Sequence, residues 1–442
     1  MRLLLVGAFP HPHHQGSQIY FQEQAIALRD QGVDVTLLTY GPPADPGRER
    51  DRGRTAREAA RARDGFDHRT SPRWIPPVSL RSGPSWPKPL ADLGLALTLR
   101  DALASSAGHD AFDAILTHHA EATLAALLVR RSDRPPIVYC VHTLLGRELP
   151  AYLNGSKVSK KRWVGRVFAD GQGSRGALSR SLGRIGDRID RGLAARVDGW
   201  VALTQSSECV MKEAGSAPGR LIPPPLPDPA TEPGGLDPRG AARRHGLEPD
   251  AFFLYSGNLD VYQELDLLEA AARRLRGTAG DPGRTRVRLI VATHQPLAAV
   301  RPGRSGEAGN AGAGEVGFIR VESAQEMLSL LAAARGSLVM RRAEGGFPIK
   351  IVNSLAVGTP VLAFRGREWG LEHERNALVC APDDPASTLA RAIERLARDD
   401  ALAKRLSAGA RALYLERHRP EVIAPATLDH LEAVLSTSRS DR

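Results

Sequence analysis

The sequence predicts an α/β protein built from two parallel-sheet halves, because short apolar runs alternate with amphipathic segments along most of the chain. The start shows this pattern clearly. Leu3–Ala8 is a short apolar run, Ser17–Gln31 carries apolar residues at helical spacing before Gly32, and Val33–Thr39 is apolar and β-branched. Strand, helix and strand in this order form a βαβ unit, whose two strands are parallel.

The same alternation continues to the end of the chain. The first half contains further predicted strands at Ala114–Leu116, Ile137–Val141 and Trp200–Leu203. The second half repeats the pattern, with strands at Phe252–Ser256, Val287–Val291, around Phe318, at Ser337–Met340 and at Pro360–Phe364, and with helices at Leu265–Leu275, Ala324–Ala334 and Ile349–Ala356. Ser323 and Glu326 have the spacing of a capping box at the start of one of these helices. From Pro385 to Leu435 the sequence is almost entirely helical.

A Pro- and Gly-rich stretch at 218–240 separates the two halves and is too rich in these residues for a packed element. We therefore expect an N-terminal domain over 1–217, a linker over 218–240, a C-terminal domain over 241–420 and a last helix over 421–442. Ligands of open parallel sheets bind beyond the carboxyl ends of the strands, so the active site is expected between the halves. Three stretches, 41–77, 157–176 and 302–314, are expected to be loop-like or disordered.

Composition narrows the class of protein. Apolar residues make up 42% and charged residues 25% of the 442 residues, which excludes a fibrous or wholly disordered chain. The apolar start ends at Pro10 without a cleavage site, and no apolar run is long enough to span a membrane. These features predict a cytoplasmic protein.

The remaining composition argues against metal and nucleic-acid sites. Cys140, Cys209 and Cys380 lie far apart, with neither a disulfide pattern nor a zinc spacing, so no metal site is expected. The net charge is +10, but aromatic residues are only 5%, and nucleic-acid binding surfaces combine basic clusters with stacking aromatics. The sequence therefore predicts no nucleic-acid partner.

One segment, from Glu344 to Val361, carries the strongest chemical signal. A Gly-rich turn leads into a helix with Pro348 in its first turn, where proline has no N–H to lose. The free N–H groups and positive dipole of such a helix, together with Lys350, would attract a diphosphate. Asn353 follows one turn later and could bind a ribose or sugar hydroxyl. The alternative is a well-capped helix between two strands, and both interpretations stay open on these residues alone.

Two other patterns are weaker. Gly171, Gly173 and Gly176 spell G-x-G-x-x-G, but they follow a basic stretch between two expected loops, so we interpret them as a chance match. The histidines at 11, 13 and 14 have no carboxylate close in sequence and indicate a polar turn after the first strand.

The segment from Glu344 to Val361 resembles the donor-binding signature of the retaining, family 4 (group 1) glycosyltransferases of the GT-B fold. The resemblance covers nearly the whole chain: the Gly7 to Gln18 loop, the Tyr139–Thr143 strand, the Val201–Ser206 strand, the Phe253–Asp260 turn and the final helices resemble family features in the same order. It implies two Rossmann-like domains facing across a cleft, with a C-terminal helix crossing back to the first domain.

The resemblance also implies an activity. It is the transfer of a sugar, with retention and without a metal or cofactor, from a nucleotide-diphosphate sugar to a glycan, lipid or small-molecule acceptor; UDP and GDP sugars both remain open. The residues that the resemblance and the motifs assign are catalytic His142, Lys350 and Arg341; donor-binding Gly16, Ser17, Gly257, Asn258, Gln263, Glu344, Gly345, Gly346, Phe347, Pro348, Asn353 and Ser354; and acceptor-side His118, His119 and Glu121.

The chain departs from the family pattern at the charged positions. Asn258 and Gln263 stand where the family carries Arg and Lys, and Asn353 replaces an acid. Lys350, and next Arg341 or Arg342, are therefore expected to neutralise the leaving diphosphate. Two rival functions remain open: a catalytically idle scaffold or binding protein, and an epimerase or phosphorylase on the same fold.

A basic segment at 157–168 surrounds Trp163, Val164, Val167 and Phe168 with Lys and Arg. It fits either a peripheral contact with an anionic membrane or a solvated loop.

Overall fold

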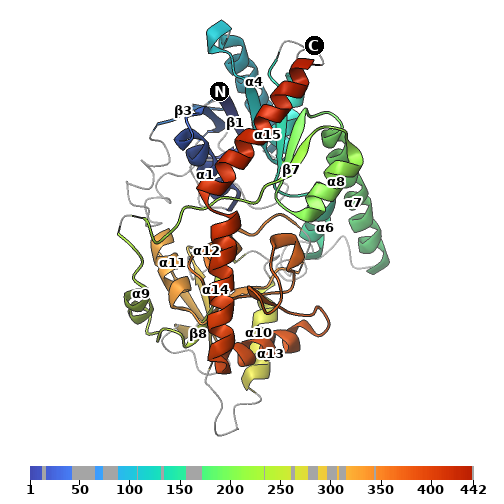
Figure 1. The fold of residues 1–442 in the computed structure, drawn as a ribbon. Helices are drawn as coiled ribbons and strands as arrows, with labels where there is room; N and C mark the ends of the chain where they lie inside the picture. The colour runs from blue at the N-terminus through green and yellow to red at the C-terminus, as the bar shows by residue number, and fades with distance from the viewer. Residues whose placement is uncertain are drawn as a thin grey trace. The chain divides into compact units, whose positions relative to one another are not determined.

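The computed structural model describes residues 1–11, 16–41, 65–72, 88–106, 108–130, 134–155, 172–232, 234–259, 264–276, 287–295, 306–307, 315–342 and 345–440. The chain forms two compact units (Figure 1). Unit 1 comprises Met1–Pro225, Glu344–Phe347 and Pro420–Arg442, and unit 2 comprises Leu226–Ala343 and Pro348–Arg419.

Unit 1 contains a seven-stranded parallel sheet with strand order β3-β2-β1-β4-β5-β6-β7. Its strands are β1 (Arg2–Pro10), β2 (Asp34–Tyr40), β3 (Asp67–Thr70), β4 (Ala114–His118), β5 (Ile137–Val141), β6 (Gly199–Ala202) and β7 (Gly219–Leu221). Its helices are α1 (Gly16–Asp30), α4 (Lys88–Ser105), α5 (His119–Leu128), α6 (Leu145–Gly155), α7 (Gln172–Ala194), α8 (Gln205–Ala214) and α15 (Pro420–Ser440).

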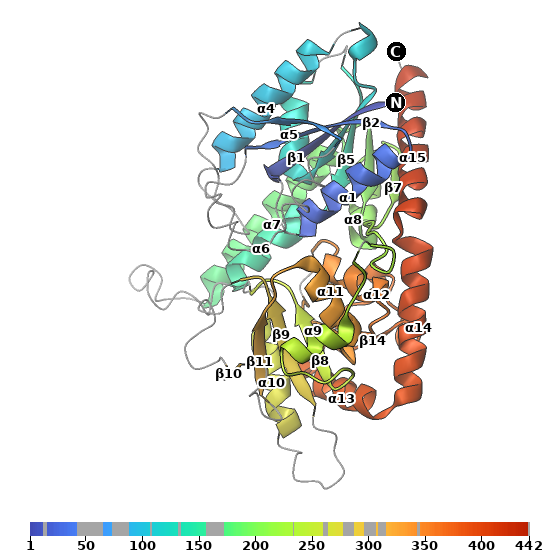
Figure 2. The same ribbon diagram turned by 90° about the vertical axis from the view of Figure 1, so that its left-hand side faces the viewer.

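Both faces of this sheet are covered, as its nearly continuous apolar strands require. Leu4, Val6 and Ala8 of β1 belong to a core that α4, α5, α7 and α8 complete. Side chains alternate across a strand, so Leu3 and Leu5 face the opposite side, which carries α1. In both views α15 lies beside α1 (Figures 1 and 2). A Cβ at Gly199 of β6 would lie 2.5 Å from a methyl of Val434 on α15. This placement confirms the expected return of the last helix to the first domain.

Unit 2 contains a second seven-stranded parallel sheet, with order β10-β11-β9-β8-β12-β13-β14. Its strands are β8 (Phe252–Ser256), β9 (Arg288–Thr293), β10 (Gly306–Glu307), β11 (Val316–Arg320), β12 (Gly336–Val339), β13 (Val361–Ala363) and β14 (Ala377–Val379). Its helices are α9 (Pro238–Arg244), α10 (Leu265–Arg276), α11 (Ala324–Ala333), α12 (Ile349–Ala356), α13 (Pro385–Arg398) and α14 (Asp400–Arg417). Phe253 and Tyr255 pack on the α10, α13 and α14 side, whereas Phe252 and Leu254 pack on the α9 and α11 side.

The predicted cap of α11 is present, with one change. Ser323 Oγ accepts a hydrogen bond from the Glu326 backbone N–H (3.1 Å), as in a capping box. The Glu326 carboxylate accepts from the N–H of Glu322 (2.8 Å) rather than from that of Ser323. The helix therefore starts where the sequence places it.

Four expectations about irregular stretches need correction. The 218–240 stretch contains β7, the edge strand of the first sheet, and the first residues of α9. The 41–77 and 302–314 stretches contain β3 and β10, and α7 begins at Gln172, so Gly173 and Gly176 lie in a helix and not between loops. β7 is a strand because it pairs with β6. Its first residue, Gly219, lies against the Trp200 ring of β6, where a Cβ would be 2.0 Å from the ring, so only glycine fits. Such long-range pairing leaves no periodic signal in three or four residues.

Within the described ranges, no helix is both long and apolar enough to cross a membrane.

Candidate active site

The strand order of unit 2 brings several of the predicted donor residues to the carboxyl ends of two neighbouring strands. β8 and β12 are parallel neighbours, with Phe253 paired to Gly336. The turn after β8 carries Gly257 and Asn258, and the loop after β12 carries Arg341 and then leads to α12. The carboxyl ends of β8 and β12 and the N-terminus of α12 therefore form one candidate site.

Gly257 is required at this edge for two reasons. First, its φ of +136° lies in a region that residues with a side chain rarely adopt. The hydrogen bond from its N–H to the carbonyl of Ala292 (3.0 Å) ties this turn to β9. A Cβ at this position would also lie 3.0 Å from the Nζ of Lys350. The turn after β8 thus leaves space that the lysine head group approaches.

Lys350 lies in an aromatic and electropositive environment. Its Nζ is 4.0 Å from the centroid of the Tyr255 ring, and the Tyr255 hydroxyl donates to the carbonyl of Asn258 (2.7 Å), which fixes the ring. Burial and, second, the positive charge of Arg341 lower the pKa of Lys350 to about 7. An anion in this place would favour the protonated form, so the arrangement suits a phosphate group.

The two arginines after β12 have different partners. Arg342 forms a bidentate ion pair with Glu264, at 3.1 Å from Nε and 2.9 Å from Nη2, and its backbone N–H donates to the same carboxylate (3.0 Å). Glu264 adopts a left-handed backbone with φ +55°. Since an acid balances the charge of Arg342, this arginine is a weak candidate for neutralising a diphosphate. Gln263 and Glu344 lie outside the described residues.

The remaining predicted donor residues have different positions. Ser354 is fully buried, and its hydroxyl lies within hydrogen-bond distance of Ser337 Oγ on β12 (2.7 Å) and of the carbonyl oxygen of Lys350 (2.8 Å). We therefore assign Ser354 to the attachment of α12 rather than to the predicted donor contact. Asn353 is only partly buried, and Pro348 is the N-cap of α12, just before the first turn in which the sequence analysis placed it. The three residues before it, Gly345, Gly346 and Phe347, group with unit 1.

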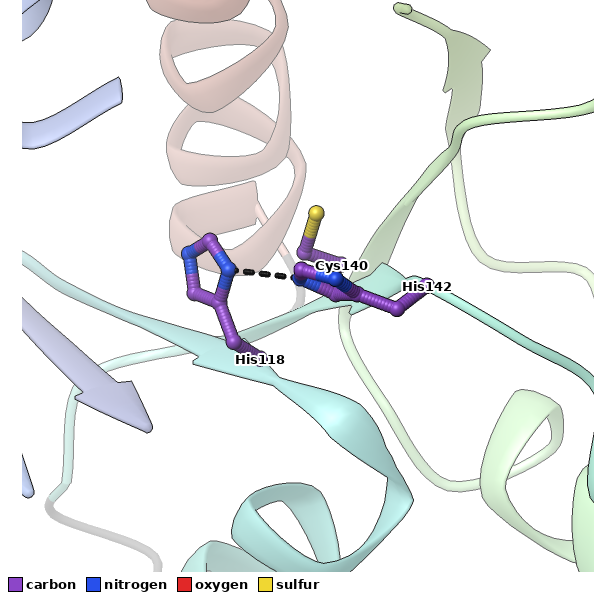
Figure 3. Close-up of side chains that lie close together, drawn as sticks. All are labelled: His118, Cys140 and His142. Carbon is purple, nitrogen blue, oxygen red and sulfur yellow. Dashed lines mark hydrogen bonds between the residues drawn. The ribbon is translucent and has the colours of Figure 1, made fainter. Parts of the chain in front are cut away.

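In unit 1 the predicted acceptor residues gather where β4 and β5 end. His118 Nδ1 lies 2.8 Å from His142 Nε2, a hydrogen-bond distance (Figure 3). The ring of His119 stacks on His142 with centroids 4.2 Å apart. His118 is fully buried, so it contacts His142 rather than an acceptor, whereas His119 is only partly buried. Gly16 and Ser17 are the first residues of α1, the helix that follows β1; β1 belongs to the same sheet as β4 and β5.

Burial keeps these imidazoles neutral at pH 7. It is the main reason why the pKa values of His118 and His142 lie well below the usual range, and the neighbouring imidazoles lower them further. The pKa of His119 is also lowered by burial, although Glu121 opposes the shift. Two neutral imidazoles share one hydrogen between Nδ1 and Nε2, with one ring as donor and the other as acceptor.

Glu121 has a partner that the sequence analysis missed. Burial alone would raise its pKa, but Lys88 of α4 forms an ion pair with it and holds the pKa below the usual value. Two residues of α1 that were not predicted also lie here: the Tyr20 hydroxyl is 3.2 Å from Cys140 Sγ, and Gln24 donates to that hydroxyl (3.0 Å). The helical spacing of α1 could have indicated which of its residues face the sheet, but not which side chains they meet.

Comparison with known proteins gives two family matches. The model described as "Glycosyltransferase Family 4" matches residues 14–227, and the one described as "Glycosyl transferases group 1" matches residues 251–399. Together they cover about four fifths of the chain.

One curated relative and two solved structures illustrate the similarity. A D-inositol 3-phosphate glycosyltransferase from Streptomyces bingchenggensis (strain BCW-1) is 31% identical over 201 residues, which span 44% of this chain and 43% of that protein. The chain thus matches less than half the length of this relative. A sucrose-phosphate synthase from Thermosynechococcus elongatus has TM-score 0.66 and 16% identity, with 99% of each chain covered. HepE from Anabaena, in complex with UDP-glucose, has TM-score 0.62 and 16% identity, with 98% of this chain and 100% of that chain covered.

At these identities the structures show the fold alone, and they confirm the GT-B class expected from the resemblance. The family matches fall on both halves in the expected order, so the chain belongs to the family 4 (group 1) glycosyltransferases.

Proposed function

We propose that this protein transfers a sugar from a nucleotide-diphosphate sugar to an acceptor hydroxyl. The observation that carries the proposal is the position of Lys350, which lies over Tyr255 beside the glycine turn at Gly257. The UDP-glucose complex of HepE, a neighbour in fold, supports a nucleotide sugar as the donor. UDP and GDP sugars both remain open for this chain.

On the donor side, the leaving nucleoside diphosphate needs positive charge as the glycosidic bond breaks. Lys350, Arg341 and the N-terminus of α12 supply that charge without a metal or cofactor. Gly257 leaves space for the phosphates, and Asn353 offers an amide to a hydroxyl one turn along the helix. The Asn258 carbonyl holds Tyr255 in place, so this residue acts through the ring.

On the acceptor side, His142 would contact a sugar hydroxyl near the reacting carbon. His119 stacks on it, the Glu121–Lys88 pair lies near His119, and these side chains could bind acceptor hydroxyls. We propose retention of configuration, with the leaving phosphate accepting the proton of the attacking hydroxyl on the same face. The chemical class of the acceptor, whether glycan, lipid or small molecule, stays open, and the membrane contact predicted for 157–168 lies outside the described residues.

A nucleotide-binding protein without turnover is the second candidate. Two observations favour it. Asn258 carries no positive charge, and the positive charge of Arg342 is balanced by Glu264. An epimerase or phosphorylase would form product without an acceptor sugar or alcohol.

Calorimetric titration with UDP, GDP and their glucose and mannose derivatives tests the donor site first. We expect one nucleotide class to bind, and Lys350→Ala to weaken it by roughly 100-fold, about 2.7 kcal/mol. Lys404→Ala, an exposed lysine on α14, is the matched control and should bind normally. Lack of binding by the wild type would overturn the proposed donor site.

Mass spectrometry and NMR of products with an acceptor panel then test the activity. An α-linked product from an α-linked donor supports transfer with retention, and an inverted product overturns the retention step. Binding without any product or released nucleoside diphosphate would move the non-catalytic candidate ahead.

A further inference from the structure

Three soft metal-ligating side chains meet on one face of the first sheet. They are His118, Cys140 and His142, and their donor atoms lie within 4.8 Å of one another (Figure 3). His118 and Cys140 are fully buried, and His142 is 5% exposed. No carboxylate belongs to the set.

The strand register produces this arrangement. His118 at the end of β4 and Cys140 on β5 are directly paired across the parallel strands. His142 follows Cys140 by two residues, so its side chain points to the same face. The three donors therefore come from rigid neighbouring strands and not from a loop.

Helix α1 covers the cluster. The Tyr20 hydroxyl contacts Cys140 Sγ at 3.2 Å, and the ring of Phe21 lies edge-on to His118 at 4.9 Å. A thiol is a weak hydrogen-bond donor, so the present contacts satisfy Cys140 poorly. The Nε2 atom of His118 is buried without a hydrogen-bond partner.

We propose that His118 Nδ1, Cys140 Sγ and His142 Nε2 form a site for one thiophilic divalent cation, Zn²⁺ by preference. Imidazole and thiolate ligands are those that zinc uses, and three protein ligands leave a fourth position for water or for the nearby Tyr20 hydroxyl. No metal was expected from the sequence, because Cys140, Cys209 and Cys380 show no zinc spacing. Strand pairing supplies the proximity that the spacing lacks.

Binding of the ion requires the two histidine nitrogens to move slightly apart and the Cys140 thiol to lose its proton. Two nitrogen ligands of a tetrahedral zinc lie about 3.3 Å apart, given Zn–N bonds of about 2.0–2.1 Å, so the 2.8 Å pair must open slightly. When the ion binds, the hydrogen shared by the two facing nitrogens moves to the other nitrogen of its own ring. His118 then carries its hydrogen on Nε2 and His142 on Nδ1, so His118 Nδ1 and His142 Nε2 can both act as ligands. Cys140 loses its thiol proton to solvent, so one proton is released for each ion bound.

The chain has three cysteines, so replacing two of them leaves one thiol to test. In the double variant Cys209→Ala/Cys380→Ala, Cys140 is the sole thiol, and the buried cluster is left intact. Titrating Co²⁺ into this chelator-treated variant should give a thiolate-to-cobalt charge-transfer band and the strong visible bands of tetrahedral cobalt, saturating at one ion per chain. Absence of the charge-transfer band would overturn the proposal.

Zn²⁺ competition with a chromophoric chelator gives the affinity. Cys140→Ala should weaken binding at least as much as the roughly 10–100-fold that loss of an outer-shell partner costs, while Cys209→Ala, which removes an exposed thiol, should not. Calorimetry in two buffers of different ionisation enthalpy should show release of about one proton. Equal affinity in Cys140→Ala and the wild type would show that zinc binds elsewhere and would overturn the site.

A metal here would withdraw His142 from the acceptor, so Zn²⁺ should inhibit transfer. This consequence rests on the proposed function, whereas the binding measurements do not. A protein that binds cobalt through Cys140 but transfers no sugar would separate the two.

Discussion

Gly257 allows a direct test at the scale of a single residue. Replacing it with alanine forces a side chain into a φ of +136° and places a Cβ 3.0 Å from Lys350 Nζ. We expect a loss of about 1–3 kcal/mol in the free energy of unfolding. We also expect nucleotide affinity at least 10-fold weaker, because the ammonium group must move.

The control for this prediction is Gly235→Ala. Gly235 also has a positive φ, +57°, but a Cβ there meets nothing within 4 Å. It should cost some stability and leave nucleotide affinity unchanged. Unfolding by urea and calorimetric titration measure the two effects, and equal affinity in both variants would contradict the role given to Gly257.

The pH dependence of donor binding should report the protonation of Lys350. Its pKa of about 7 means that the protonated form prevails in the free protein below pH 7 and is lost as the pH rises above it. Affinity for a nucleotide sugar should therefore fall between pH 7 and pH 9, and binding at pH 7 should take up protons. A Lys350→Arg variant, which stays charged, should show a flat profile; the same slope in both proteins would rule Lys350 out as its source.

The same lysine should affect folding stability with a defined sign. Because its pKa is lower in the folded than in the unfolded chain, the unfolded chain binds more protons between about pH 7 and the ordinary lysine value of 10.5. The destabilisation is complete below pH 7 and is relieved as the pH rises through that window. Lys350→Met should therefore raise the melting temperature more at pH 6.5 than at pH 9.5, and an equal increase at both would contradict this assignment.

At the scale of elements, α12 is held to β12 by the Ser354–Ser337 hydrogen bond (2.7 Å). Ser354→Ala leaves the buried Ser337 hydroxyl without this partner and should cost about 1–3 kcal/mol. Replacing both serines with alanine should recover part of that loss. Donor affinity should change little in either variant, and a large specific loss of affinity would restore Ser354 to the donor site.

At the scale of the whole molecule, α15 covers part of unit 1 although it lies at the other end of the chain. It is far from the first domain in sequence, yet it packs on α1 and at Gly199 of β6 within unit 1. A chain ending at Arg419 should expose that face, so peptides of unit 1 should become sensitive to limited proteolysis while unit 2 keeps its resistance. A chain ending at Ser440 is the control, and equal resistance of the two truncations would contradict the packing role.

The bounds of strands and helices with a strong apolar pattern could be predicted closely from the sequence. β5, β8 and α12 have the predicted bounds, because each shows its burial pattern within a few residues. β3, β7, β10 and β14 were missed, since strands of two to four residues depend on a neighbour in the sheet. Lys350 and Gly257 lie close together because motif order and strand order agree, whereas their predicted roles stay predictions. Arg342 pairs with Glu264, a residue far from it in sequence.

Local patterns in the sequence were enough to predict the α/β class, the two sheets, the family and the position of α12, because periodicity and short motifs are local properties. Only the tertiary structure decided which side chains meet: Lys88 with Glu121, Tyr20 with Cys140, and His118 with His142. The physical reason is that parallel strands pair through connections of many residues. The neighbours that set burial, pKa and metal-ligand geometry are therefore far apart along the chain.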